Sequence, residues 1–437
     1  MLERKITKEL LKWKSEPNKP CLIVKGARQV GKTFIVEKFA KDNYENYIYI
    51  NFELAPSLKG IFDGDLDFTT LRMKLEAAFP GVKIEKGQTL LFLDEIGACP
   101  NARVALKTFA MDGTLDVIGS GSLLGMFFKD ITSLPVGYER QIELMPLDFE
   151  EFLWALGISA DTIAALRSDF VEQRNPSKFI IDKFSEYFKQ YVIVGGMPAA
   201  VNAFLQTKSI NAVREVQAAL VEGYKGDVIK YAPTADRQKI IKAFESLPVQ
   251  LAKKNKKFMW SDIDSGDVGA SERKYGSTLA WLKDAGVVNF CYNLSEPTAP
   301  LNAHRRLDTF KVYMRDTGLL MSMLEPSMAT AVLDGDNLVD EGGITENVIA
   351  SELVAHGHNI AYFEKRSELE IDFVLNLNKQ VTAIEVKSGK HTQAKSMKSI
   401  IENYQTVTRY IKLEKNTAVT KDEKGCEYYP LFMGMFV

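Results

Sequence analysis

The sequence has few of the residues that would indicate a disulfide-stabilised, zinc-binding or membrane protein. Its 437 residues include only four histidines and four cysteines, and no two cysteines form a CxxC pair. This pattern excludes a zinc ribbon or a disulfide framework as the expected organisation. The N-terminal segment is interrupted by charges and lacks the apolar stretch of a signal peptide, and no run approaches the roughly 18 apolar residues of a membrane span. We therefore expect a cytoplasmic protein without a membrane partner.

An excess of charge of one sign is also missing. The chain has 55 Lys and Arg against 57 Asp and Glu, which gives a net charge of -2. A uniformly basic nucleic-acid coat is thereby excluded, so any DNA contact has to come from local basic patches. Hydrophobic residues at 46% and charged residues at 26% are typical of a globular protein. At roughly 150 residues per domain, the length predicts about three domains.

Changes of pattern along the chain predict four modules and an α/β fold class. Residues 1–155 alternate apolar strands with helices, which indicates the three-layer core of a P-loop NTPase. Residues 156–238 predict a helical module. Residues 239–330 show the helix, strand, loop, strand order of a winged helix, and residues 331–437 predict a second α/β domain.

The most specific motif is GARQVGKT, which matches GxxxxGK[ST] between a predicted strand and a predicted helix. Glycines let such a loop curl so that its N–H groups face phosphate oxygens at the positive end of a helix. Lys32 is expected to reach the β and γ phosphates of ATP, and Thr33 to bind Mg²⁺. The predicted nucleotide-binding residues are Gly26, Ala27, Arg28, Gln29, Val30, Gly31, Lys32, Thr33 and Phe34.

Two acids end the apolar strand LLFLDE, the form of a Walker B segment. Asp94 is expected to hold the metal and Glu95 to polarise the attacking water, because two carboxylates at a buried strand end need a cation. A solvated turn pair is the alternative. The following strand ends in GSGS, where Ser120 or Ser122 either senses the γ-phosphate or caps the next helix.

A hairpin near the C-terminus gathers acids on one face. A two-residue turn at Asn378–Lys379 makes the other face almost wholly apolar and places Asp372 opposite Glu385, with Lys387 two residues further on. Two neighbouring carboxylates need a proton or a cation such as Mg²⁺. The alternative is a salt-bridge network that carries no chemistry.

Local basic clusters lie in the predicted winged helix. They favour DNA contact, because cations at a helix start and a wing tip are placed to meet phosphates, while protein docking or simple solvation remains the alternative. The clusters are Lys253, Lys254, Lys256 and Lys257; Arg273 and Lys274; and His304, Arg305 and Arg306.

The Walker strings, GSGS, PVGYERQIELMPLDFEEFL, VGGMP and IEVKSG together resemble the bacterial and archaeal ATPases of the AAA superfamily that carry a C-terminal domain of unknown function. The D…ExK pattern resembles the PD-(D/E)XK nuclease fold. That resemblance implies that Asp372, Glu385 and Glu346 bind metal and that Lys387 assists the nucleophile.

Many relatives have an arginine directly after the glycine before the IEL strand, where this chain has Tyr138. The candidates for an arginine finger are therefore Arg140 and Arg103, or an arginine of a neighbouring subunit in a homo-oligomer.

Together these features predict Mg²⁺-dependent ATP binding and hydrolysis coupled to DNA binding, with metal-dependent DNA cleavage as a further activity. The principal alternative is an ATP-dependent regulatory or defence switch, acting with a partner protein, whose nuclease-like domain is inert. A P-loop phosphotransferase is a third alternative.

Overall fold

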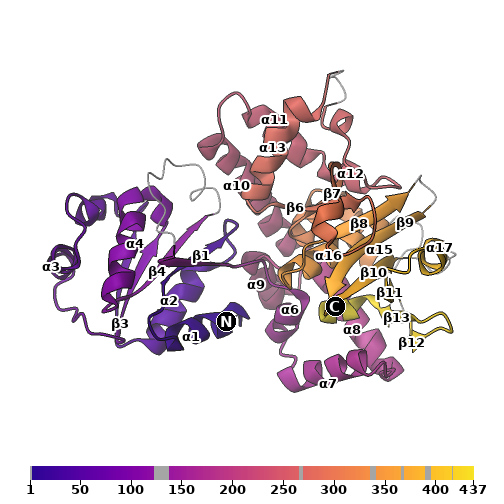
Figure 1. The fold of residues 1–437 in the computed structure, drawn as a ribbon, viewed down its shortest axis with the longest axis horizontal. Coiled ribbons are helices and arrows are strands. Elements are labelled where there is room, and N and C mark those ends of the chain that lie inside the picture. Colours follow the sequence, from indigo (N-terminus) through magenta and orange to yellow (C-terminus); the bar gives the residue numbers. More distant parts are fainter. Residues whose placement is uncertain are drawn as a thin grey trace. The chain divides into compact units, whose positions relative to one another are not determined.

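The computed structural model (Figure 1) describes residues 2–122, 137–264, 269–334, 341–365, 369–388, 395–415 and 417–437. The chain forms two compact units. The N-terminal unit is Arg4–Met145 with Asp284–Gly286, and the C-terminal unit is Met1–Glu3, Pro146–Lys283 and Val287–Val437. No helix among the described residues is long and apolar enough to cross a membrane.

The N-terminal unit is built on a five-stranded parallel sheet in the order β2-β3-β4-β1-β5. The apolar runs of the sequence become its buried strands, as the alternation of strands and helices predicted. The strands are β1 (Cys21–Gly26), β2 (Asn46–Asn51), β3 (Thr89–Asp94), β4 (Asp116–Ser122) and β5 (Glu139–Glu143).

Helices pack on this sheet and bury it. The core that includes Ile23 and Leu91 of the sheet also contains Leu71 of α3 and Leu106 and Phe109 of α4, while α2 contacts β1, β3 and β4. The elements are α1 (Ile6–Ser15), α2 (Lys32–Asn43), η1 (Pro56–Phe62), α3 (Phe68–Ala78), η2 (Ile96–Ala98) and α4 (Pro100–Asp112).

The C-terminal unit begins with the helices that the sequence predicted. Ser159, Ser177 and Ser209 each cap a helix by accepting a backbone N–H, which satisfies donors that a helix start leaves free. The helices are α6 (Phe149–Ala155), α7 (Ala160–Val171), α8 (Lys178–Val194), α9 (Pro198–Thr207), α10 (Ile210–Tyr231), α11 (Arg237–Glu245), α12 (Leu247–Leu251) and α13 (Glu272–Asp284).

A mixed eight-stranded sheet, in the order β12-β13-β11-β10-β9-β8-β6-β7, forms the centre of this unit. Its strands are β6 (Val288–Leu294), β7 (Arg305–Met314), β8 (Ala361–Lys365), β9 (Leu369–Leu377), β10 (Gln380–Lys387), β11 (Arg409–Glu414), β12 (Thr420–Lys421) and β13 (Cys426–Pro430). The remaining elements are η3 (Trp260–Asp262), η4 (Leu301–His304), α14 (Thr317–Ser322), α15 (Pro326–Asp334), α16 (Gly342–Ala355), α17 (Lys395–Asn403) and η5 (Leu431–Phe436).

Strands from both sides of residue 330 share this sheet. The antiparallel pair β6 and β7 has the order expected of a winged helix, but β6 also pairs in parallel with β8, with Tyr292 beside Ala361. The hairpin of β6 and β7 is therefore part of the larger sheet and does not belong to a separate small domain. Local order along the chain predicts a hairpin, whereas it contains no information about which distant strand adds to the hairpin's open edge.

The register predicted for the C-terminal hairpin is confirmed. Phe373 pairs with Ile384 and Leu375 with Thr382. The turn residues Asn378 and Lys379 have φ values of 50° and 67°, and two residues with positive φ are what a tight type I′ hairpin turn requires.

A buried carboxylate ties the loop Gly195–Pro198 to α14. Asp316 accepts the Gly196 N–H at 2.6 Å and the Leu319 N–H at 2.9 Å, so it caps α14 and holds the loop. A Cβ on Gly195 would overlap this carboxylate, and Gly195 has a φ of 70°, which only glycine adopts readily. Burial raises the pKa of Asp316 to about 6, although the backbone N–H groups oppose that shift.

This pKa predicts how acid affects stability. Below about pH 6 folded Asp316 binds a proton that the unfolded chain, with a pKa near 3.9, does not bind. The contribution of Asp316 to stability therefore grows as pH falls from about 6 to about 4, by up to about 1.4 kcal/mol per pH unit. Urea unfolding of the wild type and Asp316→Asn at pH 7 and pH 5 measures the difference. A difference between the two proteins that does not change with pH would contradict the assignment.

Candidate nucleotide site

The phosphate loop lies where the motif requires, between β1 and α2 (Figure 1). Gly31 has a φ of 95° at the start of α2. The Lys32 ammonium donates to the carbonyl oxygens of Gly26 at 3.2 Å and Ala27 at 2.9 Å. The lysine head group is thus held against the loop whose N–H groups are expected to cradle phosphate.

Gly26 has a role that the sequence reasoning missed. A Cβ at this position would overlap the carbonyl oxygen of Leu144, and the Leu144 N–H donates to the Lys25 carbonyl at 2.7 Å. The segment after β5 therefore packs directly on the base of the loop. The first glycine of the motif allows the loop to curl, and here it also allows close approach of two backbones.

Asp94 is the centre of a hydrogen-bond network at the end of β3. Its Oδ2 accepts from Thr33 Oγ1 at 3.0 Å, Tyr49 Oη at 3.0 Å and Asn51 Nδ2 at 2.9 Å. The structure therefore brings together the two residues predicted to hold Mg²⁺. Tyr49 and Asn51 were not predicted, although Asn51 lies beside Asp94 in the register of β2 and β3.

Ser120 lies inside β4 and therefore does not cap a helix. A cap at Ser122 stays a prediction, because residues 123–136 lie outside the described part of the chain. Ser120 is fully buried, and its hydroxyl donates to Asp94 Oδ1. The strand continues through Ser122, and Asp94 lies at the end of the neighbouring strand β3. Ser120 therefore positions the carboxylate of Asp94.

Glu95 follows Asp94 in a left-handed conformation, with a φ of 52°. Burial raises the pKa of its carboxyl; Lys32 opposes this shift and Asp94 adds to it. The charge interaction with Lys32 indicates that Glu95 lies near the phosphate loop. Strained backbone conformations of this kind cluster at functional sites, where they orient a side chain.

The two arginine candidates are engaged elsewhere in the N-terminal unit. Arg140 pairs with Glu16 at 2.7 Å and lies beside Leu22 in the sheet, four residues before Gly26, or roughly 13 Å along the strand. Arg103 forms a buried ion pair with Glu139 at 2.8 Å. The prediction of a catalytic role for Arg140 within its own chain is corrected, because parallel pairing with β1 places it near the wrong end of the strand.

The predicted metal-binding acids of the C-terminal unit are buried but bound to other groups. Glu346 accepts from Lys256 at 2.8 Å, Lys311 at 3.4 Å and Tyr313 at 3.0 Å. Lys387 pairs with Glu385 at 2.9 Å. Asp372 lies just beyond the paired part of the hairpin and accepts the Val386 N–H at 2.8 Å.

These contacts do not fit a divalent metal. Among the residues that the structure describes, no group of three or more His, Cys, Asp or Glu side chains is arranged to hold one. The predicted set of Glu346, Asp372 and Glu385 is therefore corrected, because Lys256 and Lys311 from distant segments compensate Glu346, and Lys387 of the same strand pairs with Glu385. Burial, together with Glu346, raises the pKa of Asp372 to about 7, while Lys311 and Lys387 oppose this.

The basic cluster before η3 is also committed to acids. Lys253 pairs with Asp262, Lys256 with Glu346, and Lys257 with Glu364 at 2.6 Å. These three lysines therefore do not form the phosphate-binding patch that the sequence predicted. Exposed cations of the same region are Lys254, Arg273, Lys274 and Arg306.

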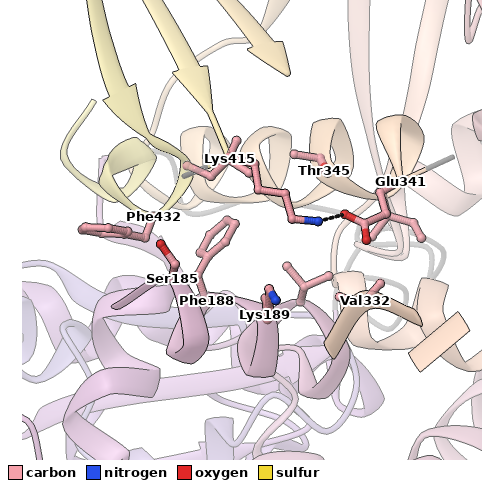
Figure 2. A pocket seen from close by; sticks show the side chains of 11 residues that line it. Ser185, Phe188, Lys189, Val332, Glu341, Thr345, Lys415 and Phe432 are labelled. Carbon is pink, nitrogen blue, oxygen red and sulfur yellow. Dashed lines mark hydrogen bonds and ion pairs between the residues drawn. The ribbon is translucent and has the colours of Figure 1, made fainter. Parts of the chain in front are cut away.

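A small cavity of about 40 Å³ lies elsewhere in the C-terminal unit. Figure 2 shows that Phe188, Val332 and Phe432 line it, with the ion pair between Lys415 and Glu341 (2.9 Å) at one side. Its volume is enough for about three water molecules, and no residue predicted from the sequence to act in a site lines it.

The parallel sheet, the phosphate loop and the Asp94 network define the N-terminal unit as a P-loop nucleotide-binding domain. Residues 18–153 match the family model described as an AAA domain. Residues 185–329 and 341–431 match two further models, each described as a domain of unknown function.

Comparisons with whole proteins add little. No curated protein matches the chain. Similar solved structures include the Aeropyrum pernix ORC1 protein in complex with DNA (12% identity, 77% of this chain and 93% of that chain, TM-score 0.31) and the Aeropyrum pernix ORC2 protein in its ADP form (13%, 75% and 91%, 0.32). Another is Cdc6p from Pyrobaculum aerophilum (13%, 74% and 91%, 0.23). TM-scores this low do not establish a common architecture.

The packing of Gly26 predicts the effect of a single methyl group. Gly26→Ala should weaken ATP binding at least about tenfold and destabilise the N-terminal unit by roughly 1–3 kcal/mol, since the loop has to move away from Leu144. Gly60→Ala is the matched control, because a Cβ there meets nothing within 4 Å. Titration with a fluorescent ATP analogue measures the ATP affinity of the two variants. Equal affinities for the two variants would refute the packing role.

Proposed function

We propose that the N-terminal unit binds ATP with Mg²⁺ and hydrolyses it. The observation that carries this proposal is the Asp94 network, in which a buried carboxylate and the Thr33 hydroxyl lie 3.0 Å apart beside the phosphate loop. Oxygen ligands of this kind fit Mg²⁺. Thr33 and Asp94 would hold the ion, which neutralises charge on the β and γ phosphates when it is bound.

The remaining residues of the site have separate roles in this proposal. Lys32 contacts the β and γ phosphates, and Glu95 accepts a proton from the attacking water. Ser120, Tyr49 and Asn51 position Asp94. Phe34 directly follows the loop with 53% of its surface exposed, which supports contact with the nucleoside.

The engaged arginines support a homo-oligomer. Because Arg103 and Arg140 are held in ion pairs within the N-terminal unit, we propose that an arginine of a second copy of the chain completes the site. An arginine finger supplied by another molecule is a known way to stabilise the charge that develops on the γ-phosphate.

DNA is the proposed partner of the C-terminal unit, through the exposed cations Arg273 and Lys274 at the start of α13 and Arg306 at the start of β7. The helix, strand, strand order of α13, β6 and β7 supports a winged-helix-like arrangement in this segment, although β6 also pairs with β8 beyond residue 330. The lysines bound to Glu346 and Glu385 favour the second candidate function, an ATP-dependent switch whose nuclease-like fold binds without cleaving.

Two substitutions separate binding from hydrolysis. Lys32→Ala should remove ATP binding, whereas Glu95→Gln should retain binding and lower kcat by about 100-fold or more, because only the proton acceptor is lost. Glu76→Gln, in an exposed ion pair on α3, is the control with unchanged activity. Phosphate release and equilibrium binding are the measurements. Full hydrolysis by Lys32→Ala would overturn the proposed site.

The DNA contact has its own test. Arg306→Ala should weaken binding to duplex DNA several-fold. It should also reduce the slope of log K against log salt concentration by about one. Lys178→Ala, which removes an exposed cation of α8, should leave both quantities unchanged. Fluorescence anisotropy at several salt concentrations measures them, and identical behaviour of the two variants would exclude Arg306 from the interface.

A further inference from the structure

Lys311 is a fully buried lysine on β7, an edge strand of the C-terminal sheet, with 0% of its surface exposed. Its ammonium lies 2.7 Å from Glu370 Oε1 and 3.4 Å from Glu346 Oε2, and 5.0 Å from the ring centroid of Tyr362. One ammonium group thus bridges two carboxylates that come from β9 and α16. A buried charge is retained only when its partners compensate the loss of water.

A second lysine approaches the same acid from another segment. Lys256 lies 2.8 Å from Glu346 Oε1, so each oxygen of this carboxylate contacts a different ammonium group. Lys256 has a φ of 49°, a conformation that costs a non-glycine residue of its size free energy. The next residue, Lys257, bridges to Lys311 through the backbone and extends its side chain to Glu364. The turn therefore directs two successive lysines into the acidic cluster.

The charges of the cluster are already close to balance. Five carboxylates face four ammonium groups: Glu346, Glu364, Glu370, Asp372 and Glu385 with Lys256, Lys257, Lys311 and Lys387. With all nine groups charged the sum is -1, and a divalent cation would change it to +1, so the charge count gives no need for a metal ion. The cation would also have to separate Lys311 from both carboxylates while that ammonium stays buried, which is strongly unfavourable.

We propose that Lys311 and Lys256 are built-in counter-ions that occupy the place of a divalent cation, so that the acidic cluster is closed to metal and the C-terminal unit does not cleave nucleic acid by a metal-dependent route. This inference deepens the second candidate function, the ATP-dependent switch, and rests on it. The cluster then joins β7, β9 and α16 into one structure instead of forming a reaction centre.

The wild-type protein provides the first test. Mn²⁺ is titrated into the full chain without nucleotide, and its binding is followed by electron paramagnetic resonance. In a separate assay, the protein and Mn²⁺ are incubated with single-stranded and double-stranded DNA and RNA. We expect no saturable Mn²⁺ site that Glu346→Gln removes, and no cleavage. Cleavage that is lost in Asp372→Ala, or a stoichiometric Mn²⁺ site that is lost in Glu346→Gln, would overturn the proposal.

Removing the counter-ion provides the second test. Lys311→Met should lower the Tm by about 5 °C or more in EDTA, and Mn²⁺ or Mg²⁺ should restore most of this loss, because Glu370 loses its contact with Lys311 and Glu346 keeps only Lys256. Lys415→Met is the matched control: it leaves only Glu341 without its lysine (Figure 2), so its Tm should fall without recovery in metal. Recovery in both variants, or in neither, would contradict the counter-ion role.

If Lys311→Met does not fold, the wild-type titration decides the question, and the double variant Lys311→Met/Glu346→Gln, which removes both charges, is expected to fold. Hydrolysis of ATP is measured separately on the same wild-type preparation. A protein that hydrolyses ATP but binds Mn²⁺ at Glu346 would refute only this inference, whereas a protein without ATPase activity would refute the proposed function.

Discussion

The compensation of buried carboxylates is the constraint on which both units depend. In the N-terminal unit, Asp94 is only 2% exposed, and such a group is stable only when its lone pairs are satisfied. Its partners Tyr49, Ser120 and Thr33 come from β2, β4 and α2. A single side chain therefore connects the sheet to the phosphate loop. These partners are neutral donors, so they satisfy the carboxylate without cancelling its charge, which suits a site for a cation.

The C-terminal unit meets the same constraint in the opposite way. Glu346 is 5% exposed and contacts the charged groups of Lys256 and Lys311. Ammonium groups cancel the charge of a carboxylate as well as satisfying its oxygens, which removes the need for a metal ion. The difference between neutral and charged partners thus distinguishes a site prepared for a cation from one that is already filled by the chain itself.

Much of the fold followed from local patterns. The glycine-rich motif fixed the position of the phosphate loop, because strand, loop and helix are consecutive in the sequence. The hairpin register followed from alternation, because a one-residue slip would expose Phe373 and Ile384. The partners of Ser120 and Lys256 could not be predicted in this way. Each lies on a segment distant in sequence, and many polar residues could have met the same acid.

The sequence by itself therefore determined the phosphate loop, the apolar strands and the pairing within the hairpin, since these depend on residues close along the chain. Tertiary structure decided what the acids do. Only the order of strands in each sheet, and the packing of α16 in the C-terminal unit, place Ser120 on Asp94 and Lys311 beside Glu346 and Glu370. A carboxylate's charge is fixed by its residue type, but its function depends on which distant group shares its buried environment.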